Sequence, residues 1–465
     1  MKSRKDQVQA YFFVVGRLAA AVTHGNPEAL QAPGRRMVTG TIFGFLIAVL
    51  LAAVFGILGL FVPGTDTSWR QAGNLVMDKD TGARYVYLDD QLRPVLNYSS
   101  ARLLAPRSGG KMSSVSASSL SGTPVGQPVG IASAPDALPA AADLDAGAWT
   151  VCVQPAGDGN SAPVVSLLIG RPAEGTMTDR QAFLVSGPDG TGYLVWNGTR
   201  LRVPDPVVLA SLGYGGIRPA PVSTAWLNPI PQGPDLTVPS IDGIGRPGPV
   251  IGGRQSIVGQ IYEVKNAALG TSQMYLVRED GVVALDRTVA ALLLSAPATA
   301  RAYPGAAVEP VEVGVAATAG IPSPATNLGA GLPAEPPEIV SGRDDVQPCV
   351  RFGTSGEPEE ELVPSATVQR ISVPAAPHQA GTAADRVSVP AGKGALVAPK
   401  SAPGAVPGPT SLVTDVGMRY PIAGPDVLDA FGYGNVAVTT VSPELLALFP
   451  AGPLLSTAAA SGTGA

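Results

Sequence analysis

The sequence has little of the chemistry from which most catalytic and metal sites are built. Its 465 residues include two histidines, His24 and His378, and two cysteines. A serine–histidine–aspartate site needs a histidine held rigidly beside its partners, and a zinc site needs several Cys or His ligands. The scarcity of both residue types therefore argues against either kind of site.

A phosphate-binding loop of the G-x-x-x-x-G-K-[ST] type is also missing. The nearest matches are Gly109-Gly110-Lys111 and Gly392-Lys393-Gly394, and neither has the upstream glycine or the Ser/Thr after the lysine. Both are interpreted as loops. We therefore expect no catalytic residues, no cofactor and no enzyme, while the sequence leaves open whether any nucleotide hydrolysis occurs.

Charged residues are sparse, at 14% of the chain. Residues 1–37 carry a balance of +4, which leaves −9 for the rest of a chain whose net charge is −5. Without a clustered basic face we expect no nucleic-acid partner. The acidic run at Glu357, Glu359, Glu360 and Glu361 could gather a hard cation, but we interpret it as a solvated loop and expect no metal.

Gly (56) and Pro (46) are abundant instead. Both are poor helix formers, so the pattern predicts many short strands and turns in place of long helices. Apolar residues make up 45% of the chain, enough to build cores. Residues 38–62 are the exception, an uncharged apolar run of 25 residues that is long enough to cross a bilayer as one helix.

A cleaved signal peptide would have a shorter apolar core nearer the N-terminus, and a buried core helix is disfavoured by the length of the run. Arg35 and Arg36 precede the run, and Asp66 is the first charge after it. Excess Lys and Arg mark the cytoplasmic side. The sequence thus predicts a single-pass protein of the inner (plasma) membrane, with a cytoplasmic N-terminus and most of the chain exported.

Small residues recur at every fourth position of this run. Such a stripe lets membrane helices pack closely, so we expect a helix–helix contact, with a second copy or another subunit, through Gly40, Gly44, Ala48, Ala52 and Gly56.

The segment before the span predicts an amphipathic cytoplasmic helix that ends near Gly25 and Pro27. A short exposed helix is marginal alone, so its apolar face needs either a protein or the membrane surface. We favour a protein, because the polar face has few basic residues. The expected contact residues are Val8, Tyr11, Phe12, Val15 and Leu18.

Internal repeats indicate how the chain after the apolar run is organised. Three segments share the pattern Val-Ser-x3-Leu-x3-Pro-x-Gly, beginning at Val115, Val222 and Val441. Before each lies a hairpin-like unit and a helix-like run, and a fourth such unit near residues 274–294 has a degenerate downstream half at 315–322. Asn197-Gly198 and Asp280-Gly281 are hairpin turn signals.

We therefore expect an α+β protein: a short cytoplasmic helix, one transmembrane helix, and an elongated exported domain of four β-rich repeats around a central core. The expected segments are a cytoplasmic segment 1–37, the span 38–62, repeats at 69–140, 181–240, 255–330 and 394–456, core parts 145–180 and 340–373, a linker 374–393, and a disordered tail 457–465.

The two cysteines, Cys152 and Cys349, lie in strand-like settings between the repeats, on the oxidising side of the span. Two buried free thiols are the alternative, but we favour a disulfide that closes the central core. A bridge across 197 positions could stabilise the fold by about 4–5 kcal/mol in the chain-entropy model.

Several segments resemble the EccB family of actinobacterial type VII (ESX) secretion systems. They include residues 5–11 ahead of Arg17-Leu18, the Arg35-Arg36 pair, residues 81–103, residues 124–126 and 134–139, and the settings of Cys152 and Cys349. The resemblance runs from about residue 5 to 455.

The resemblance implies a non-catalytic scaffold that dimerises and works with EccC (a motor ATPase), EccD and EccE in the inner membrane. It also implies four repeats around a disulfide-closed core. Because such repeats resemble a cell-wall-binding unit of a phage lysin, a membrane-tethered peptidoglycan-binding module is the second hypothesis. An ATPase is the third, since some family members carry that name.

Overall fold

The computed structural model describes most of the chain. The described residues are 4–25, 34–61, 67–105, 112–145, 147–154, 162–266, 269–324, 328–341, 345–353, 357–377 and 382–462. His378, the candidate loop at residues 109–111 and the last three residues of the expected tail lie outside these ranges, as do the side chains of Arg35 and Arg36.

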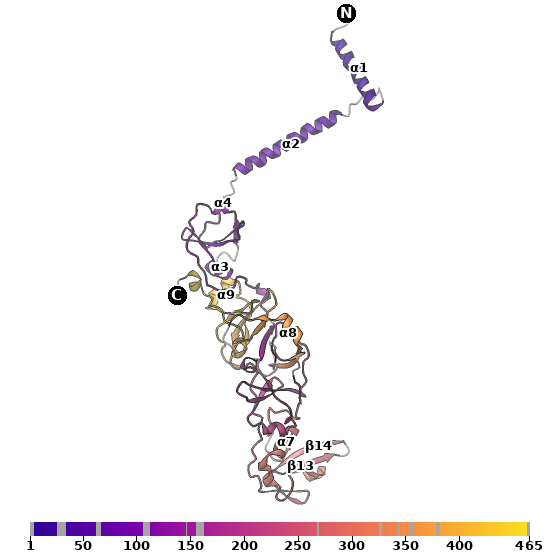
Figure 1. The fold of residues 1–465 in the computed structure, drawn as a ribbon, viewed down its shortest axis with the longest axis vertical. Helices are drawn as coiled ribbons and strands as arrows, with labels where there is room; N and C mark the ends of the chain where they lie inside the picture. The colour runs from indigo at the N-terminus through magenta and orange to yellow at the C-terminus, as the bar shows by residue number, and fades with distance from the viewer. Residues whose placement is uncertain are drawn as a thin grey trace.

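Two long helices precede the body of the protein and stand apart from it (Figure 1). Helix α1 spans Arg4–His24, and α2 spans Gly34–Phe61. At a rise of 1.5 Å per residue, the 28 residues of α2 extend about 42 Å, more than the bilayer core requires. The helix begins four residues before the apolar run, so Arg35 and Arg36 lie in its first turn.

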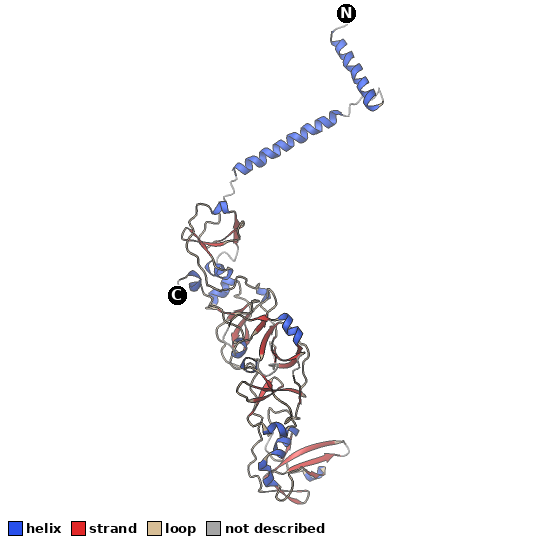
Figure 2. Cartoon of the chain, in the orientation of Figure 1, coloured by secondary structure: helices blue, strands red, loops and turns tan. Residues whose placement is uncertain are grey.

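The body is elongated and rich in short strands (Figure 2). Four of its sheets share one strand order: three strands form an antiparallel meander, and a fourth pairs in parallel with the first. Sheet 1 comprises β1 (Leu75–Asp78), β2 (Arg84–Leu88), β3 (Gln91–Pro94) and β4 (Met112–Val115); sheet 2 comprises β7 (Gln181–Ser186), β8 (Gly192–Trp196), β9 (Thr199–Val203) and β10 (Ala220–Pro221).

Sheet 3 comprises β13 (Ile261–Asn266), β14 (Thr271–Arg278), β15 (Gly281–Leu285) and β16 (Val311–Val313); sheet 4 comprises β22 (Ala395–Pro399), β23 (Ser411–Val413), β24 (Arg419–Pro421) and β25 (Thr439–Val441). Strand β17 (Glu338–Ile339) also pairs with β7, and the hairpin β11 (Pro247–Ile251) and β12 (Arg254–Ile257) precedes sheet 3.

Each sheet carries short helices at the same two places. After the third strand come α3 (Tyr98–Leu104), α5 (Val207–Ser211), α7 (Arg287–Ser295) with η3 (Pro297–Ala302), and α9 (Pro425–Phe431). After the fourth strand come α4 (Ala117–Leu120), α6 (Thr224–Leu227), η4 (Val315–Ala317) and α10 (Pro443–Leu446). The Val-Ser-x3-Leu part of the repeated motif therefore begins where the fourth strand ends and covers the short helix that follows it.

The Pro-x-Gly end of the motif pairs with the third strand of the meander, at the outer edge of the sheet. In sheet 4, Arg419 of β24 donates its N–H to Pro450 O, and its carbonyl accepts the N–H of Gly452. A Cβ on Gly452 would lie 2.4 Å from the Tyr420 ring. Glycine is needed here because the two segments approach so closely.

Sheet 3 makes the same contact with the glycine on the other side. Val282 N donates to Ile321 O, and Ser323 N donates to Val282 O. A Cβ on Gly281 would lie 2.6 Å from the Ile321 carbonyl oxygen. The close approach is retained while the glycine has moved to the facing strand, so the motif is degenerate in sequence at residues 315–322 but complete in structure.

A six-stranded central sheet lies between the other four, in the order β19-β18-β5-β6-β21-β20. Its strands are β5 (Trp149–Gln154), β6 (Val164–Ile169), β18 (Val346–Phe352), β19 (Glu359–Pro364), β20 (Val373–Pro374) and β21 (Arg386–Ser388), with η2 (Ala141–Asp143) before β5 and α8 (Ser365–Ile371) after β19.

The expected linker at 374–393 is wrong in part. Strand β21 pairs in parallel with β6, and both Ala384 and Val387 are buried in the main apolar cluster. The Ala/Pro-rich composition suggested a spacer, but small apolar side chains here fit against a crowded sheet. Within this segment, β21 and the last residue of β20 therefore belong to the central sheet.

The four outer sheets dock in pairs, sheet 1 with sheet 4 and sheet 2 with sheet 3 (Figure 1). The hydroxyl of Tyr433 in sheet 4 donates to Pro139 O, and that of Tyr214 in sheet 2 donates to Pro337 O, both at 2.6 Å. Each half of the chain is thus a sheet, a hairpin and a second sheet. The halves meet at the β5–β18 pair with approximate two-fold symmetry, which the strand order β19-β18-β5-β6 also displays.

The expected disordered tail at 457–465 is also wrong for its described residues. Helix α11 spans Thr457–Ser461, and its Ala460 is fully buried in the cluster shared by sheets 1 and 4. Ser456 caps the helix by accepting the N–H of Ala459. The low-complexity composition of this segment gave no indication of the short capped helix, which is stabilised by packing.

Candidate functional site

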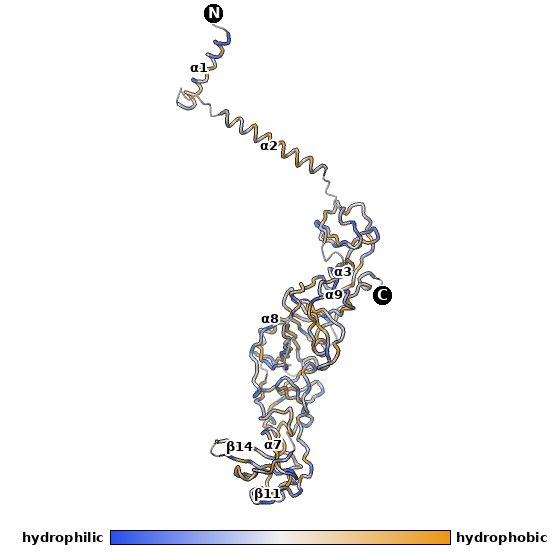
Figure 3. The backbone as a smooth tube through the Cα atoms, turned by 180° about the vertical axis from the view of Figure 1, so that it is seen from behind, coloured by the Kyte–Doolittle hydropathy of each residue, from blue (hydrophilic) through white to orange (hydrophobic). Residues whose placement is uncertain are grey.

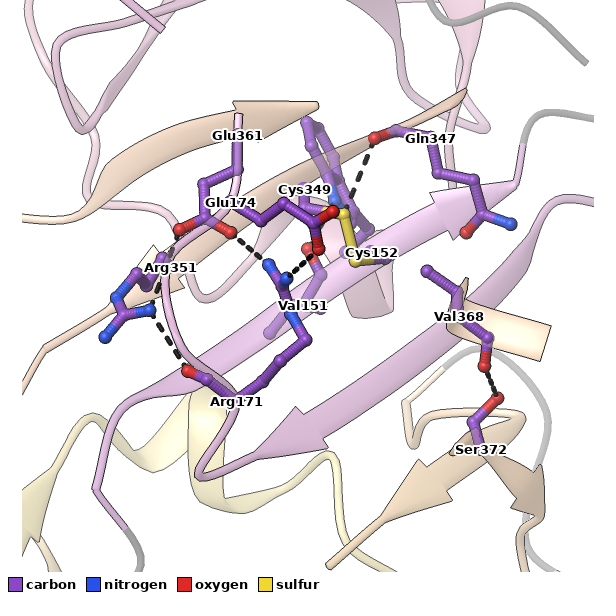
Figure 4. The surroundings of a disulfide bond; sticks show 11 residues. Val151, Cys152, Arg171, Glu174, Gln347, Cys349, Arg351, Glu361, Val368 and Ser372 are labelled. Carbon is purple, nitrogen blue, oxygen red and sulfur yellow. Dashed lines mark hydrogen bonds and ion pairs between the residues drawn. A yellow bond between two sulfur atoms is a disulfide. The ribbon is translucent and has the colours of Figure 1, made fainter. Parts of the chain in front are cut away.

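The centre of the molecule is a disulfide between Cys152 of β5 and Cys349 of β18 (Figure 4). The two cysteines are direct partners in the antiparallel register, with 4.0 Å between their Cα atoms, and both are fully buried. Leu168, Val363 and Val368 pack around them. Because one cysteine comes from each half of the chain, the bridge joins the halves covalently where they meet.

Beside the disulfide lies a buried ion network that the sequence interpretation missed (Figure 4). Arg171 pairs with Glu361 and, at 3.0 Å, with Glu174. Arg351 lies 3.8 Å from the Glu361 carboxylate and donates to Arg171 O at 3.1 Å. The side chain of Glu361 is 0% exposed. These contacts fix the edge strand β19 to the segment that follows β6.

The acidic run at 357–361 is therefore not a solvated loop throughout. Glu359 is exposed at the start of β19, whereas Glu360 and Glu361 are buried. A clue was available in the apolar Leu362-Val363 that follows, which is typical of a buried strand. The charges are tolerated because each buried carboxylate has a partner.

Glu360 holds sheet 2 against the central sheet. Its Oε1 accepts the backbone N–H of Gly198 at 2.9 Å, in the β8–β9 turn. A Cβ on Gly198 would lie 2.4 Å from Pro358 O, and its φ of +71° also favours glycine. Burial raises the pKa of Glu360, and the Gly198 hydrogen bond lowers it in part. Burial likewise raises the pKa of Glu361, and the charges of Arg171 and Arg351 oppose that increase.

Apolar side chains that follow sheets 2 and 4 in the chain both pack against the central sheet. Trp226 of α6 is fully buried, and its indole N–H donates to Val151 O at 3.1 Å. Phe449, after α10, packs edge-on against Trp149 of β5 with 5.3 Å between ring centroids. The sequence marked the repeated motif that contains these residues, but nothing in it showed that both copies meet on one sheet.

The small-residue stripe lies on α2, whose described side chains are exposed in the single chain. No other atom comes within 4 Å of a Cβ added at Gly40, Gly44 or Gly56. Successive members four residues apart advance by about 40° around an α-helix, so the stripe winds gently along its face. Figure 3 shows hydrophobic residues along the middle of the helix.

Among the described residues, one helix is long and apolar enough to cross a membrane, with Met37–Ile57 as the candidate span. On α1, the predicted contact residues are all exposed: Val8, Tyr11, Phe12, Val15 and Leu18. Their spacing places them along one side of the helix. Neighbouring apolar residues Phe13 and Val14 are exposed as well, so α1 is apolar over more than one face.

The candidate loop at Gly392–Gly394 has a structural explanation. Lys393 in the Gly392–Gly394 turn pairs with Asp143 at 2.6 Å, and a Cβ on Gly394 would lie 2.5 Å from Val413 O. This turn therefore packs sheet 4 against η2. Over the part of the chain that the structure describes, three or more Asp, Glu, His or Cys side chains do not gather as a possible metal site.

Fold and site together define a class of protein: a helix of membrane-spanning length followed by an elongated body of four like sheets around a disulfide-bridged centre. A family model described as "Type VII secretion system ESX-1, transport TM domain B" matches residues 2–463. The chain belongs to this family, the EccB family of type VII secretion membrane proteins.

Relatives and solved structures agree. The chain is 30% identical to "ESX-3 secretion system ATPase EccB3" of Mycobacterium tuberculosis, over 98% of this chain and 88% of the relative, and 29% identical to "ESX-1 secretion system ATPase EccB1" of the same species, over 74% and 70%. It is similar to a chain of an intact ESX-5 inner membrane complex (TM-score 0.69, 26% identity, 99% and 95% covered) and to the EccB3 dimer of the ESX-3 core complex (TM-score 0.68, 27% identity, 83% and 99% covered).

Proposed function

We propose that this chain is a non-catalytic structural subunit of a type VII secretion membrane complex. The observation that carries the proposal is the buried junction at the centre of the body. There, sheets 2 and 4 share one apolar cluster with the disulfide-bridged sheet. Such a junction holds distant surfaces of a long body in fixed positions, which is the property a scaffold requires.

The membrane helix and α1 would anchor the subunit. Arg35 and Arg36 at the start of α2 favour a cytoplasmic N-terminus, and the sheets would then lie on the periplasmic side. With α1 inside, its exposed apolar residues would bind cytoplasmic parts of neighbouring subunits, for which EccC, EccD and EccE are the candidates. The body would pair with a second copy, as the EccB3 dimer suggests.

The four sheets are proposed to be copies of one ancestral unit. Their shared strand order and their matched edge contacts support common descent. The proposed repeats are 69–140, 181–240, 255–330 and 394–456, around core parts 145–180 and 340–373. On this proposal the repeats provide contact surfaces, and the core determines their spacing.

Affinity purification of the full-length protein from detergent-solubilised membranes, followed by mass spectrometry, tests the function. We expect a large assembly that contains a motor ATPase and a multi-span subunit. Ala52→Leu, on the small-residue stripe, is expected to weaken the assembly, while Ala53→Leu makes the same size change on the neighbouring face and serves as the matched control. Recovery of the protein alone would contradict the proposal.

The names of the relatives include the word ATPase, so nucleotide turnover is measured on the same material. We expect activity to remain with the motor subunit when the complex is separated. Turnover that follows this chain through further purification would favour the enzyme hypothesis. Retention on purified peptidoglycan without co-purifying membrane subunits would favour the wall-binding hypothesis.

A further inference from the structure

Sheet 1 follows the membrane helix in the chain, and its contact with the rest of the body is made largely by α3. Leu103 of α3 is buried in one cluster with Val427 and Phe431 of α9 in sheet 4. Arg102 donates Nε and Nη2 to the carbonyl oxygen of Ala430, near the C-terminal end of α9. The α3–α9 contact is thus the inner side of the joint between sheets 1 and 4.

Helix α11 closes the outer side of this joint. It packs on α3, with Ala460 fully buried in the same cluster as Leu103. Its first residue, Thr457, donates its hydroxyl to Asp426 of α9 at 3.2 Å. Helix α11 therefore touches both partners of the joint, and its short length is stabilised by that double contact and by its Ser456 cap.

Among its described residues, the joint between sheets 2 and 3 has no helix at the position that α11 occupies in the joint between sheets 1 and 4. Leu455 and Leu236 occupy matching positions, since each donates its N–H to the third strand of its sheet, at Pro421 O and Arg202 O. After Leu455 the chain forms α11, but after Leu236 it continues without a helix through residues 237–244. A pocket of about 400 Å³ lies between that segment and the end of α7.

We propose that α11 is a clasp that fixes sheet 1, the first sheet after the membrane helix in the chain, on sheet 4. The joint between sheets 2 and 3, at the other end of the body, has no such clasp within its described residues and is left the more adjustable of the two. The proposal concerns the orientation of sheet 1 and holds whether or not the chain joins a secretion complex.

Distance measurement between two spin labels on the full-length protein tests the clasp. Labels are placed at Ser114→Cys in sheet 1 and at Val406→Cys in the loop between β22 and β23 of sheet 4, both exposed positions. The two native cysteines are paired in the buried disulfide and do not take up label. The labelled chain is mixed with an excess of unlabelled chain, so that distances between two copies do not contribute. We then expect one narrow distance distribution for the otherwise wild-type chain.

Ala460→Arg and a chain that ends at Leu455 are both expected to lose that single narrow distribution, because each removes the buried contact on α3. Ala458→Arg is the matched control: Ala458 is on the same helix with its side chain exposed, so the narrow distribution is expected to persist. A narrow distribution in both disrupted variants, or equal broadening with Ala458→Arg, would overturn the proposal. Hydrogen exchange on β23 separates a loosened joint from unfolding of sheet 4; loss of protection there would also overturn it.

Discussion

Three consecutive glutamates at the start of β19 are expected to respond differently to one substitution, Glu→Gln. Glu361→Gln removes a fully buried negative charge and leaves Arg171, whose side chain is only 7% exposed, without its main partner. Breaking a buried ion pair from one side costs about 3–5 kcal/mol. We expect about 3 kcal/mol, the lower end of that range, because Glu174 still pairs with Arg171.

Glu360→Gln is expected to leave stability unchanged or raise it slightly at pH 7. The amide oxygen of glutamine still accepts the Gly198 N–H, while the cost of burying a charge disappears. Glu359→Gln is the surface control, since Glu359 is exposed, and its effect should stay within about 0.5 kcal/mol.

The pH dependence provides a second test of the same residues. Burial raises the pKa of Glu360 in the folded protein above its ordinary value of 4.5, so the folded state binds the proton more tightly than the unfolded state. Its contribution to stability therefore increases as pH falls from neutral through the folded pKa, and levels off below the unfolded pKa. Glu360→Gln removes this increase, so its advantage over wild type should shrink as the pH falls from neutral towards the ordinary pKa of 4.5.

Urea unfolding followed by tryptophan fluorescence measures these effects, because Trp149 and Trp226 are buried in the central cluster. With a slope of about 2 kcal/mol per molar urea, Glu361→Gln should lower the midpoint by about 1.5 M. Equal effects of the Glu360 and Glu361 substitutions would refute the distinction between a hydrogen-bonded carboxylate and an ion-paired one.

Three further changes test other contacts. Replacing Cys152 and Cys349 together by Ala should destabilise the body by about 2–5 kcal/mol. The thermal midpoint should fall, and reducing agent should not lower it further. An unchanged midpoint would show that the disulfide does not stabilise the body. Gly198→Ala should cost clearly more than Gly190→Ala, since both have positive φ but a Cβ at Gly190 meets no atom within 4 Å; equal urea midpoints would show that the Pro358 contact is unimportant. Tyr433→Phe should cost about 1–2 kcal/mol by removing the bond to Pro139, and should speed hydrogen exchange at the joint of sheets 1 and 4; unchanged exchange would contradict this.

Local sequence patterns predicted the elements whose physics is local. The length of the apolar run alone predicted a membrane-length helix, and Asn197-Gly198 marked a hairpin turn that the structure contains between β8 and β9. The two cysteines were expected to pair, and they do. For the membrane-length helix and the hairpin turn, the deciding interactions lie within one segment.

Features that depend on distant partners could not be derived in this way. The charge of Glu361 is compatible with burial only because Arg171 and Arg351 approach from other parts of the chain. Likewise, α11 is a short alanine-rich segment with little helical stability of its own. Its burial depends on α3, which lies more than 350 positions earlier in the chain.

Removing this chain from the cell shows whether it organises a secretion membrane complex. Membranes of a strain that lacks the chain are solubilised, the motor subunit is purified, and the size and composition of what accompanies it are compared with the intact strain. The large assembly is expected to be lost and to return when the wild-type chain or Ala53→Leu is supplied, but not fully with Ala52→Leu. An assembly of unchanged size and composition without the chain would contradict this expectation.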